Sequence, residues 1–200
     1  MKTANKSQAI MGILLRDFCR HTATSLSKQL KISRWGVWKI LRNLKKGQMI
    51  LLESIGNGKT STNEVKLNWS NPLVEKNLSV YLTQEALEYK KWRFNFERLE
   101  KEVEFFILFG SILHSPKEAN DIDVIIVAKK KNFVKIGDLM INIQISQEKD
   151  IHSTNFTKSE FKKELKKGNR AYLDAIKRGV ILFGQESFIK FMKVMHGYEG

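Results

Sequence analysis

Two acidic side chains stand where an apolar run of the sequence begins. Asp121 and Asp123 are separated by one isoleucine in "DIDVIIV", and this run predicts a β-strand. Alternate residues of a strand lie on the same face, so both carboxylates point the same way. Like charges at this spacing repel each other, and burying them unpaired is costly. The pair therefore predicts a bound cation, and Mg²⁺ prefers such oxygen ligands.

A glycine and a serine end the apolar segment that comes before this pair. Nine residues separate Ser111 from Asp121. The sequence predicts a strand over residues 104–109, a sharp turn at Gly110 and a short helix over residues 112–114. Glycine lets a backbone approach a phosphate closely, and amides with a serine hydroxyl can bind phosphate oxygens. Together with the acidic pair, these parts are typical of a phosphoryl-transfer or nucleotidyl-transfer site.

The stretch "LFGS" followed by "DIDVIIV" resembles the DNA polymerase beta-like nucleotidyltransferase superfamily, and its short spacing is similar to that of the minimal members. The resemblance implies that Gly110 and Ser111 bind a nucleoside triphosphate (NTP). It also implies that Asp121 and Asp123 are catalytic residues that coordinate two divalent ions, Mg²⁺ or Mn²⁺. A nucleoside monophosphate would then pass to a hydroxyl of a nucleic-acid or protein acceptor, with release of pyrophosphate.

The family's third carboxylate is expected on the next core strand, and the sequence departs from the family there. The strand predicted over residues 139–146, "LMINIQIS", carries isoleucines on one face and Asn142 and Gln144 on the other. An amide can bind a metal but cannot act as a carboxylate base, so activity is expected to be weakened or absent. Asp138 and Asp150 flank this segment and reach the site only if the alignment is shifted.

Two functions stay open. The first is a Mg²⁺-dependent nucleotidyltransferase with a nucleic-acid-binding module. The second is a DNA-binding transcriptional regulator whose degenerate C-terminal domain binds nucleotide without turnover. The intact Gly-Ser and Asp-x-Asp favour nucleotide and metal binding in both cases, and the missing third acid favours the second.

Positive charge is concentrated in the first third of the chain. The formal net charge is +14, and residues 1–70 hold 13 Lys and Arg against 3 Asp and Glu, whereas the remaining residues hold 22 against 18. This asymmetry indicates a polyanionic partner for the N-terminal part, nucleic acid first and a membrane surface second. A solvated basic face without a partner is the alternative interpretation.

The same third of the chain predicts three helices followed by a hairpin. The helices are expected over residues 7–18, from a capping Thr24 to Leu30, and over residues 33–46; the hairpin spans residues 49–69 around the tip "GNGKTST". This order resembles the winged helix-turn-helix family. The resemblance implies that the third helix enters the major groove of double-stranded DNA. The residues expected to contact nucleic acid are Arg34, Trp35 and Lys39 in the groove, with Arg42, Lys45, Lys46 and Lys59 on phosphates.

The sequence predicts an α+β protein of three parts: a winged helix-turn-helix over 1–70, a helical connector over 71–102, and an α/β nucleotidyltransferase fold with a mixed sheet over 103–200. One long helix is expected in the connector from Thr83. Its apolar stripe contains Tyr89, Trp92, Phe96, Leu99 and Val103. This stripe could seat the C-terminal domain, bridge the two domains or form a homodimer.

The bulk composition predicts a cytoplasmic protein. No apolar run approaches the roughly 20 residues that span a bilayer, and the first residues lack the pattern of a secretory signal. The single cysteine, Cys19, excludes an internal disulfide and is expected to pack in the core as part of the first helix.

Overall fold

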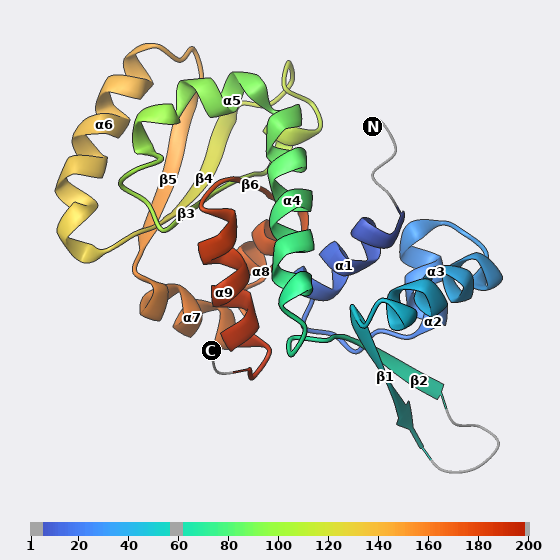
Figure 1. Ribbon diagram of the computed structural model, residues 1–200. Coiled ribbons are helices and arrows are strands. Elements are labelled where there is room, and N and C mark those ends of the chain that lie inside the picture. Colours follow the sequence, from blue (N-terminus) through green and yellow to red (C-terminus); the bar gives the residue numbers. More distant parts are fainter. Residues whose placement is uncertain (1–5, 57–61, 199–200) are drawn as a thin grey trace.

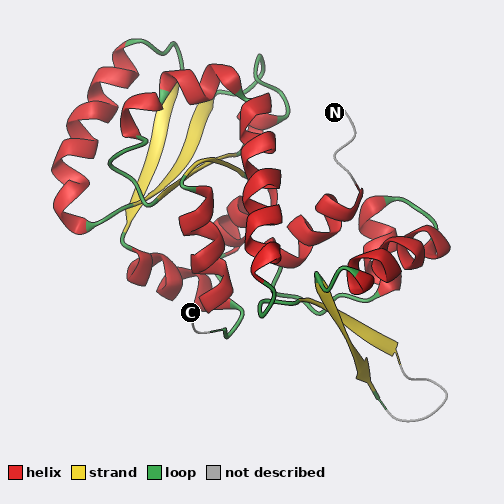
Figure 2. Ribbon diagram, viewed as in Figure 1, coloured by secondary structure: helices red, strands yellow, loops and turns green. Residues whose placement is uncertain are grey.

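A computed structural model describes residues 6–56 and 62–198 (Figure 1). Helices and a small hairpin form the N-terminal part, and a mixed four-stranded sheet with helices on both faces forms the C-terminal part (Figure 2). The predicted α+β fold class is confirmed. Among the described residues, no helix has the length and apolar character needed to cross a bilayer.

The N-terminal part has the element order of a winged helix-turn-helix. Its elements are α1 (Lys6–Arg16), α2 (Ala23–Leu30), α3 (Arg34–Lys46), β1 (Ile50–Ile55) and β2 (Thr62–Leu67). The two strands are antiparallel, with Ile50 opposite Leu67. Ser33 caps α3 as predicted, because its side chain accepts a hydrogen bond from the Gly36 amide. The hairpin tip with Lys59 lies outside the described residues.

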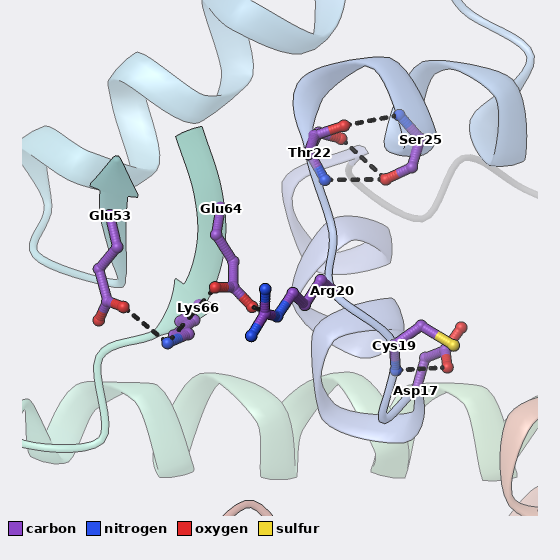
Figure 3. Close-up of polar contacts among 8 residues, drawn as sticks. All are labelled: Asp17, Cys19, Arg20, Thr22, Ser25, Glu53, Glu64 and Lys66. Carbon is purple, nitrogen blue, oxygen red and sulfur yellow. Dashed lines mark hydrogen bonds and ion pairs between the residues drawn. The ribbon is translucent and has the colours of Figure 1, made fainter. Parts of the chain in front are cut away.

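The start of α2 differs from the prediction by two residues. Thr22, and not Thr24, is the N-cap, and Ser25 completes the cap by accepting a hydrogen bond from the Thr22 amide (Figure 3). The same view shows Lys66 on β2 beside two carboxylates. Its Nζ lies 2.6 Å from Glu53 and 3.5 Å from Glu64. Cys19 is exposed after the end of α1, so its predicted core packing is wrong.

The connector is not one long helix. It consists of α4 (Pro72–Glu88), α5 (Lys90–Asn95) and the 3-10 turn η2 (Glu97–Leu99). Helix α4 begins after Asn71, which caps it, and ends at Tyr89, whose φ of −103° and ψ of 46° are not helical. The predicted stripe nevertheless has a clear role, because Trp92, Phe96 and Leu99 are buried in the cluster under the sheet. Among the three roles considered, the stripe seats the C-terminal part.

The sheet has the strand order β5-β4-β3-β6. Its strands are β3 (Phe105–Phe109), β4 (Asp121–Val127), β5 (Asp150–Phe156) and β6 (Val180–Phe183). Strand β3 is antiparallel to both β4 and β6, whereas β4 and β5 are parallel. The parallel pair needs a crossover connection, and the helix α6 (Phe133–Ile145) supplies it.

Period-two alternation divides the sheet residues between two apolar clusters. Phe106, Leu108 and Val124 belong to the cluster that contains the buried residues of α5 and α6. Phe105 and Ile107 belong to the cluster that contains the buried residues of the remaining C-terminal helices. These helices are α7 (Lys158–Lys166), α8 (Arg170–Arg178) and α9 (Gln185–Met195), and Thr157 and Asn169 cap the first two. Figure 1 shows α6 on one side of the sheet and α7, α8 and α9 on the other.

Residues 139–145 lie in α6 and Ser146 is its C-cap, so the strand predicted over residues 139–146 is wrong. Ile136, Met140 and Ile143 are buried at helical spacing against the sheet, whereas Ile141 and Ile145 are exposed. The strand next to β4 is β5, about ten residues further along the chain. The prediction that Asn142 or Gln144 stands in place of the third carboxylate depended on the strand predicted over residues 139–146, so it is wrong as well.

The N-terminal and C-terminal parts share one apolar cluster. It contains Ile10 and Leu14 of α1, residues of α4, and residues of the sheet and α9. Arg16 at the end of α1 forms a buried ion pair with Glu85 of α4. The His196 ring nitrogen Nε2 also lies 2.8 Å from the Leu15 carbonyl. The winged-helix elements are therefore packed directly onto the C-terminal part.

Candidate functional site

The acidic pair lies at the start of β4, as predicted. Asp121 and Asp123 have the same parity as Ile125 and Val127, so their side chains lie on the sheet face that α7, α8 and α9 cover further along. Both carboxylates remain partly accessible, with side-chain exposures of 33% and 30%. The sheet therefore holds two neighbouring carboxylates on one rigid strand and leaves them open to a ligand.

Gly110 lies directly against this pair. Phe109, the last residue of β3, is paired with Asp123, so the turn that follows β3 passes beside the carboxylate. Gly110 has a φ of 83° and a ψ of −164°, which only glycine adopts readily. A Cβ built at this position would come within 2.4 Å of Asp123 Oδ2. Glycine is thus required twice, for the turn and for the space that the carboxylate occupies.

The two carboxylates interact unfavourably in the absence of a cation. Partial burial, followed by the neighbouring Asp121 carboxylate, raises the pKa of Asp123, and the nearby His152 offsets part of this rise. Proximity of like charges is expected to have this effect, and a positive ion between the side chains would reverse it. The electrostatics of the site therefore agree with the cation predicted from the sequence.

His152 is the site residue that the sequence analysis did not identify. It lies on β5, where the parallel register places it next to Asp123. Its Nδ1 lies 3.3 Å from Asp121 Oδ2 and 4.0 Å from Asp123 Oδ1. The three side chains offer ligand atoms that all lie within 4.8 Å of one another. The signal in the sequence was the alternation in "DIHSTNF", which is weak because one face of this strand is mostly polar.

The donor set fits a divalent cation. Carboxylate oxygens suit Mg²⁺ and Mn²⁺, and an imidazole nitrogen is a common ligand of transition metals. Asp121 and Asp123 come from one strand and His152 from its neighbour, so the backbone hydrogen bonds of the sheet fix their spacing. Asp150 pairs with Asp121 in the same register but is not part of this group of ligand atoms.

A cavity of about 290 Å³ adjoins the Gly110 turn on the side of α8. Its polar lining includes the predicted Ser111 together with Asp174 and Arg178 of α8. Ser111 is exposed and begins the short 3-10 turn η3 (Ser111–Leu113). The structure thus places a hydroxyl and a guanidinium in one cavity beside the turn, and Arg178 was not singled out from the sequence.

The predicted nucleic-acid residues of α3 form an exposed basic surface. Val37, Leu41 and Leu44 bury the opposite face of this helix. The exposed residues are Arg34, Trp35, Lys39, Arg42, Lys45 and Lys46, and α3 contains no acidic residue. Trp35 is 69% exposed, and the Arg42 guanidinium lies 5.5 Å from the centroid of its ring. Trp38, by contrast, is partly buried and packs against the core.

Solved structures similar to this chain include two bacterial proteins. The adhesin competence repressor AdcR from Streptococcus pyogenes matches at 21% identity and a TM-score of 0.37, over 48% of this chain and 68% of that chain. A cysteine-to-serine mutant of ZitR from Lactococcus lactis matches at 20% identity and a TM-score of 0.36, over 50% and 68%. These similarities are too weak to support an argument about fold or function. No curated protein matches the chain.

The match that bears on the site covers the sheet. It begins in the last turn of α5, includes β3, the Gly110 turn, β4 and β5, and ends just after β6. All the residues of the carboxylate–imidazole group lie inside this segment, as do Gly110, Ser111 and Arg178. Residues 95–184 match the family described as "Polymerase beta, Nucleotidyltransferase", so this segment of the chain is similar to that family.

Proposed function

We propose that the protein is a metal-dependent nucleotidyltransferase that transfers a nucleoside monophosphate from an NTP to a hydroxyl of a nucleic-acid or protein acceptor. The single observation that supports this most is the meeting of Asp121, Asp123 and His152 beside Gly110, inside the segment that matches the family. In this reaction the acceptor oxygen forms a bond to the α-phosphorus, and the bond to the bridging oxygen of the leaving pyrophosphate breaks. The hydroxyl proton passes to water.

Asp121 and Asp123 hold the divalent cation in this proposal. When bound, Mg²⁺ or Mn²⁺ supplies positive charge that stabilises the negatively charged phosphates during transfer. The carboxylates are suited to this task because the sheet fixes them 3.3 to 4.0 Å from the His152 nitrogen and leaves each about one-third exposed. Gly110 leaves the space that the Asp123 carboxylate occupies, since a Cβ at this position would come within 2.4 Å of Asp123 Oδ2.

Ser111 and Arg178 bind the triphosphate in this proposal. The hydroxyl of Ser111 can donate a hydrogen bond to a phosphate oxygen, and the guanidinium of Arg178 can donate two in parallel. Both side chains line the cavity of about 290 Å³ that adjoins the Gly110 turn. Arg178 would thus supply the fixed positive charge that the carboxylates cannot offer.

The winged-helix elements bind double-stranded DNA in this proposal. The chain is divided at about residues 70 and 102, so that the part before residue 70 binds DNA and the part after residue 102 binds and transfers the nucleotide. The supporting observation is the acid-free outer face of α3, on which Trp35, Lys39 and Arg42 lie exposed. Lysine and arginine contacts to phosphate give affinity that falls with salt, whereas contacts from the early residues of the helix select the sequence. The phosphate contact proposed for Lys59 rests on the sequence alone.

A second function is favoured by a specific observation. The site contains an imidazole at the position adjacent to Asp123 on β5, where no third carboxylate joins the group of described residues. An enzyme of this family without that carboxylate could bind nucleotide without turnover, and the protein would then be a DNA-binding regulator that responds to NTP. Both functions require the same cation and nucleotide sites, and they differ only in product formation.

One experiment separates these functions. The full chain is incubated with α-³²P-labelled NTPs, Mg²⁺ or Mn²⁺, and either duplex DNA, RNA or a total protein extract as acceptor. Transfer of label to a macromolecule with release of pyrophosphate, lost in Asp121→Asn and Asp123→Asn, supports the enzyme. Specific, salt-sensitive duplex binding that NTP alters without pyrophosphate release supports the regulator. Absence of NTP binding at millimolar concentration would rule out both.

A further inference from the structure

We propose that His152 is a nitrogen ligand of the cation held by Asp121 and Asp123, and that it makes the site select Mn²⁺ over Mg²⁺. This inference depends on the proposed function only in taking the carboxylate pair as a cation site. It does not depend on turnover, on the acceptor or on DNA binding.

The position of His152 on the sheet favours a ligand over a chance surface neighbour. His152 is paired with Asp123 in the parallel ladder, and residues 150, 152, 154 and 156 of β5 share one face. Phe156 shows which face this is, because its ring contacts Phe161 of α7. Asp121 and Asp123 lie on the same side as α7. The imidazole and both carboxylates are thus held on one face by two hydrogen-bonded strands.

The two distances from His152 to the carboxylates agree with ligands that share one ion. Two ligand atoms that each lie about 2.1 Å from a metal are separated by about 3.0 Å at an angle of 90° and by at most about 4.2 Å. The Nδ1 atom of His152 lies 3.3 Å from Asp121 Oδ2 and 4.0 Å from Asp123 Oδ1. Both separations fall in this interval before any side chain moves, and the side chains are exposed enough to adjust.

The acidic residues considered as replacements are less well placed than His152. Asp138 lies on α6, and α6 covers the face of the sheet opposite to the carboxylate pair. Asp150 is exposed at the first position of β5, beside Asp121 but outside the group of ligand atoms that converge within 4.8 Å. Within the part of the chain that the structure describes, the group therefore consists of two carboxylates and one imidazole.

This donor set predicts the preference for Mn²⁺. Mg²⁺ is bound mainly by oxygen ligands, and exchanging a third carboxylate for a neutral imidazole removes one negative charge from its site. Imidazole binds transition metals well, and Mn²⁺ also accepts carboxylate, phosphate and water oxygens. Two carboxylates and one imidazole leave further positions open on Mn²⁺, which the phosphate oxygens of an NTP could occupy. The substitution would thus change which ion loads the site.

The test uses the metal-free full chain without nucleotide. Mn²⁺ binding is followed by the loss of the free-ion signal in electron paramagnetic resonance, and Mg²⁺ by competition. Coupling of bound Mn²⁺ to a ¹⁴N nucleus is read from electron spin-echo envelope modulation. The variants are His152→Ala, His152→Asp and, as a matched control, the exposed His114→Ala. His152 is 63% exposed, so its replacement leaves the core intact, and thermal melting verifies folding.

We expect the wild-type protein to bind Mn²⁺ at least tenfold more tightly than Mg²⁺ and to show ¹⁴N coupling. His152→Ala loses the coupling and about tenfold or more in Mn²⁺ affinity, His152→Asp gains affinity for Mg²⁺, and His114→Ala changes neither. Mn²⁺ bound with no ¹⁴N coupling, or with equal affinity in His152→Ala, overturns the inference and leaves the proposed function standing. Failure of both ions to bind at millimolar concentration overturns the cation site itself, and with it both proposals.

Discussion

The substitution Gly110→Ala tests the two reasons for a glycine beside the carboxylates, which are the backbone conformation of the turn and the space that Asp123 occupies. The added methyl group would lie 2.4 Å from Asp123 Oδ2, well inside van der Waals contact. That oxygen is the end of a rotatable side chain, so the carboxylate can swing away at little cost in packing. Rotation also relieves its repulsion from Asp121, which partly raises the pKa of Asp123. The stability loss should therefore come mainly from the backbone.

The magnitude follows from the conformation of residue 110. A φ of 83° with a ψ of −164° costs a residue with a Cβ about 2 kcal/mol. For a chain of this size, such a loss lowers Tm by roughly 4–8 °C. The loss of cation affinity should be larger in relative terms. A change that merely misorients a metal ligand weakens binding by about 10–100-fold, and Gly110→Ala displaces one ligand altogether.

Gly168 offers a matched control. Its φ is 75°, and a Cβ added there would meet no heavy atom within 4 Å. Gly168→Ala should therefore reproduce the loss of stability without affecting the cation. Differential scanning calorimetry gives Tm, and isothermal titration with Mn²⁺ gives affinity. Wild-type Mn²⁺ affinity in Gly110→Ala would refute the reasoning, because it would mean that the Asp123 carboxylate is not needed where the structure places it.

Four further predictions concern Arg16, Asp123, Arg42 and Arg178. Arg16→Ala leaves the partly buried Glu85 without its partner and should cost about 1–3 kcal/mol in urea unfolding, whereas the double change Arg16→Met with Glu85→Leu should restore most of it. Asp123→Asn should raise the Tm of the metal-free protein at pH 7, because the pKa of Asp123 is raised and ionisation of its carboxyl therefore disfavours the folded state. The gain in Tm should disappear as the pH falls below the ordinary pKa of aspartate, because residue 123 is then neutral in both proteins. Arg42→Ala should lower the slope of log K against log salt for duplex binding by about 1 if it contacts a phosphate, and an unchanged slope would exclude that contact. Arg178→Ala should weaken NTP binding at least about tenfold in fluorescence titration and leave Mn²⁺ affinity unchanged; a loss of both would place Arg178 in the cation site instead.

The acidic pair could be predicted from the sequence because the signals there are local. A strand, a glycine turn and two alternate acids within about twenty residues determine one another's positions, and the structure brings Gly110 and Asp123 together as expected. The winged-helix elements were predictable for the same reason, since caps such as Ser33 and the buried positions Val37 and Leu41 act within one helix. Such features need little information from distant parts of the chain.

The strand that carries His152 could not be found in this way. Residues 139–146 alternate apolar and polar side chains, which favours a strand, but α6 buries only Met140 and Ile143 of this segment and leaves Ile141 and Ile145 exposed. Strand β5 shows the reverse case. Its face near the site must remain polar and open, so Asp150 begins a segment with little apolar alternation. Packing against the sheet decided both cases, and neighbouring residues alone do not encode that packing.

The break at Tyr89 was hidden for a related reason. Trp92 and Phe96 continue the apolar spacing of α4, so periodicity alone predicts an uninterrupted helix. The chain bends because these rings must reach the underside of the sheet, where Phe96 lies 4.9 Å from Phe106 between ring centroids. Such packing against distant residues is not encoded in the residue types around Tyr89, where the helix stops.

The shared apolar cluster between α1, α4 and α9 has a mechanical consequence. Ile10 and Leu14 are packed against the C-terminal helices, and Arg16 is paired with Glu85, so packed side chains join the winged-helix elements to the C-terminal part. The two parts of the protein are thus held together as one packed unit. This packing fixes where α3 and the carboxylate pair lie relative to each other, and lengthening or shortening the chain around residue 70 could not change that arrangement without first opening the core.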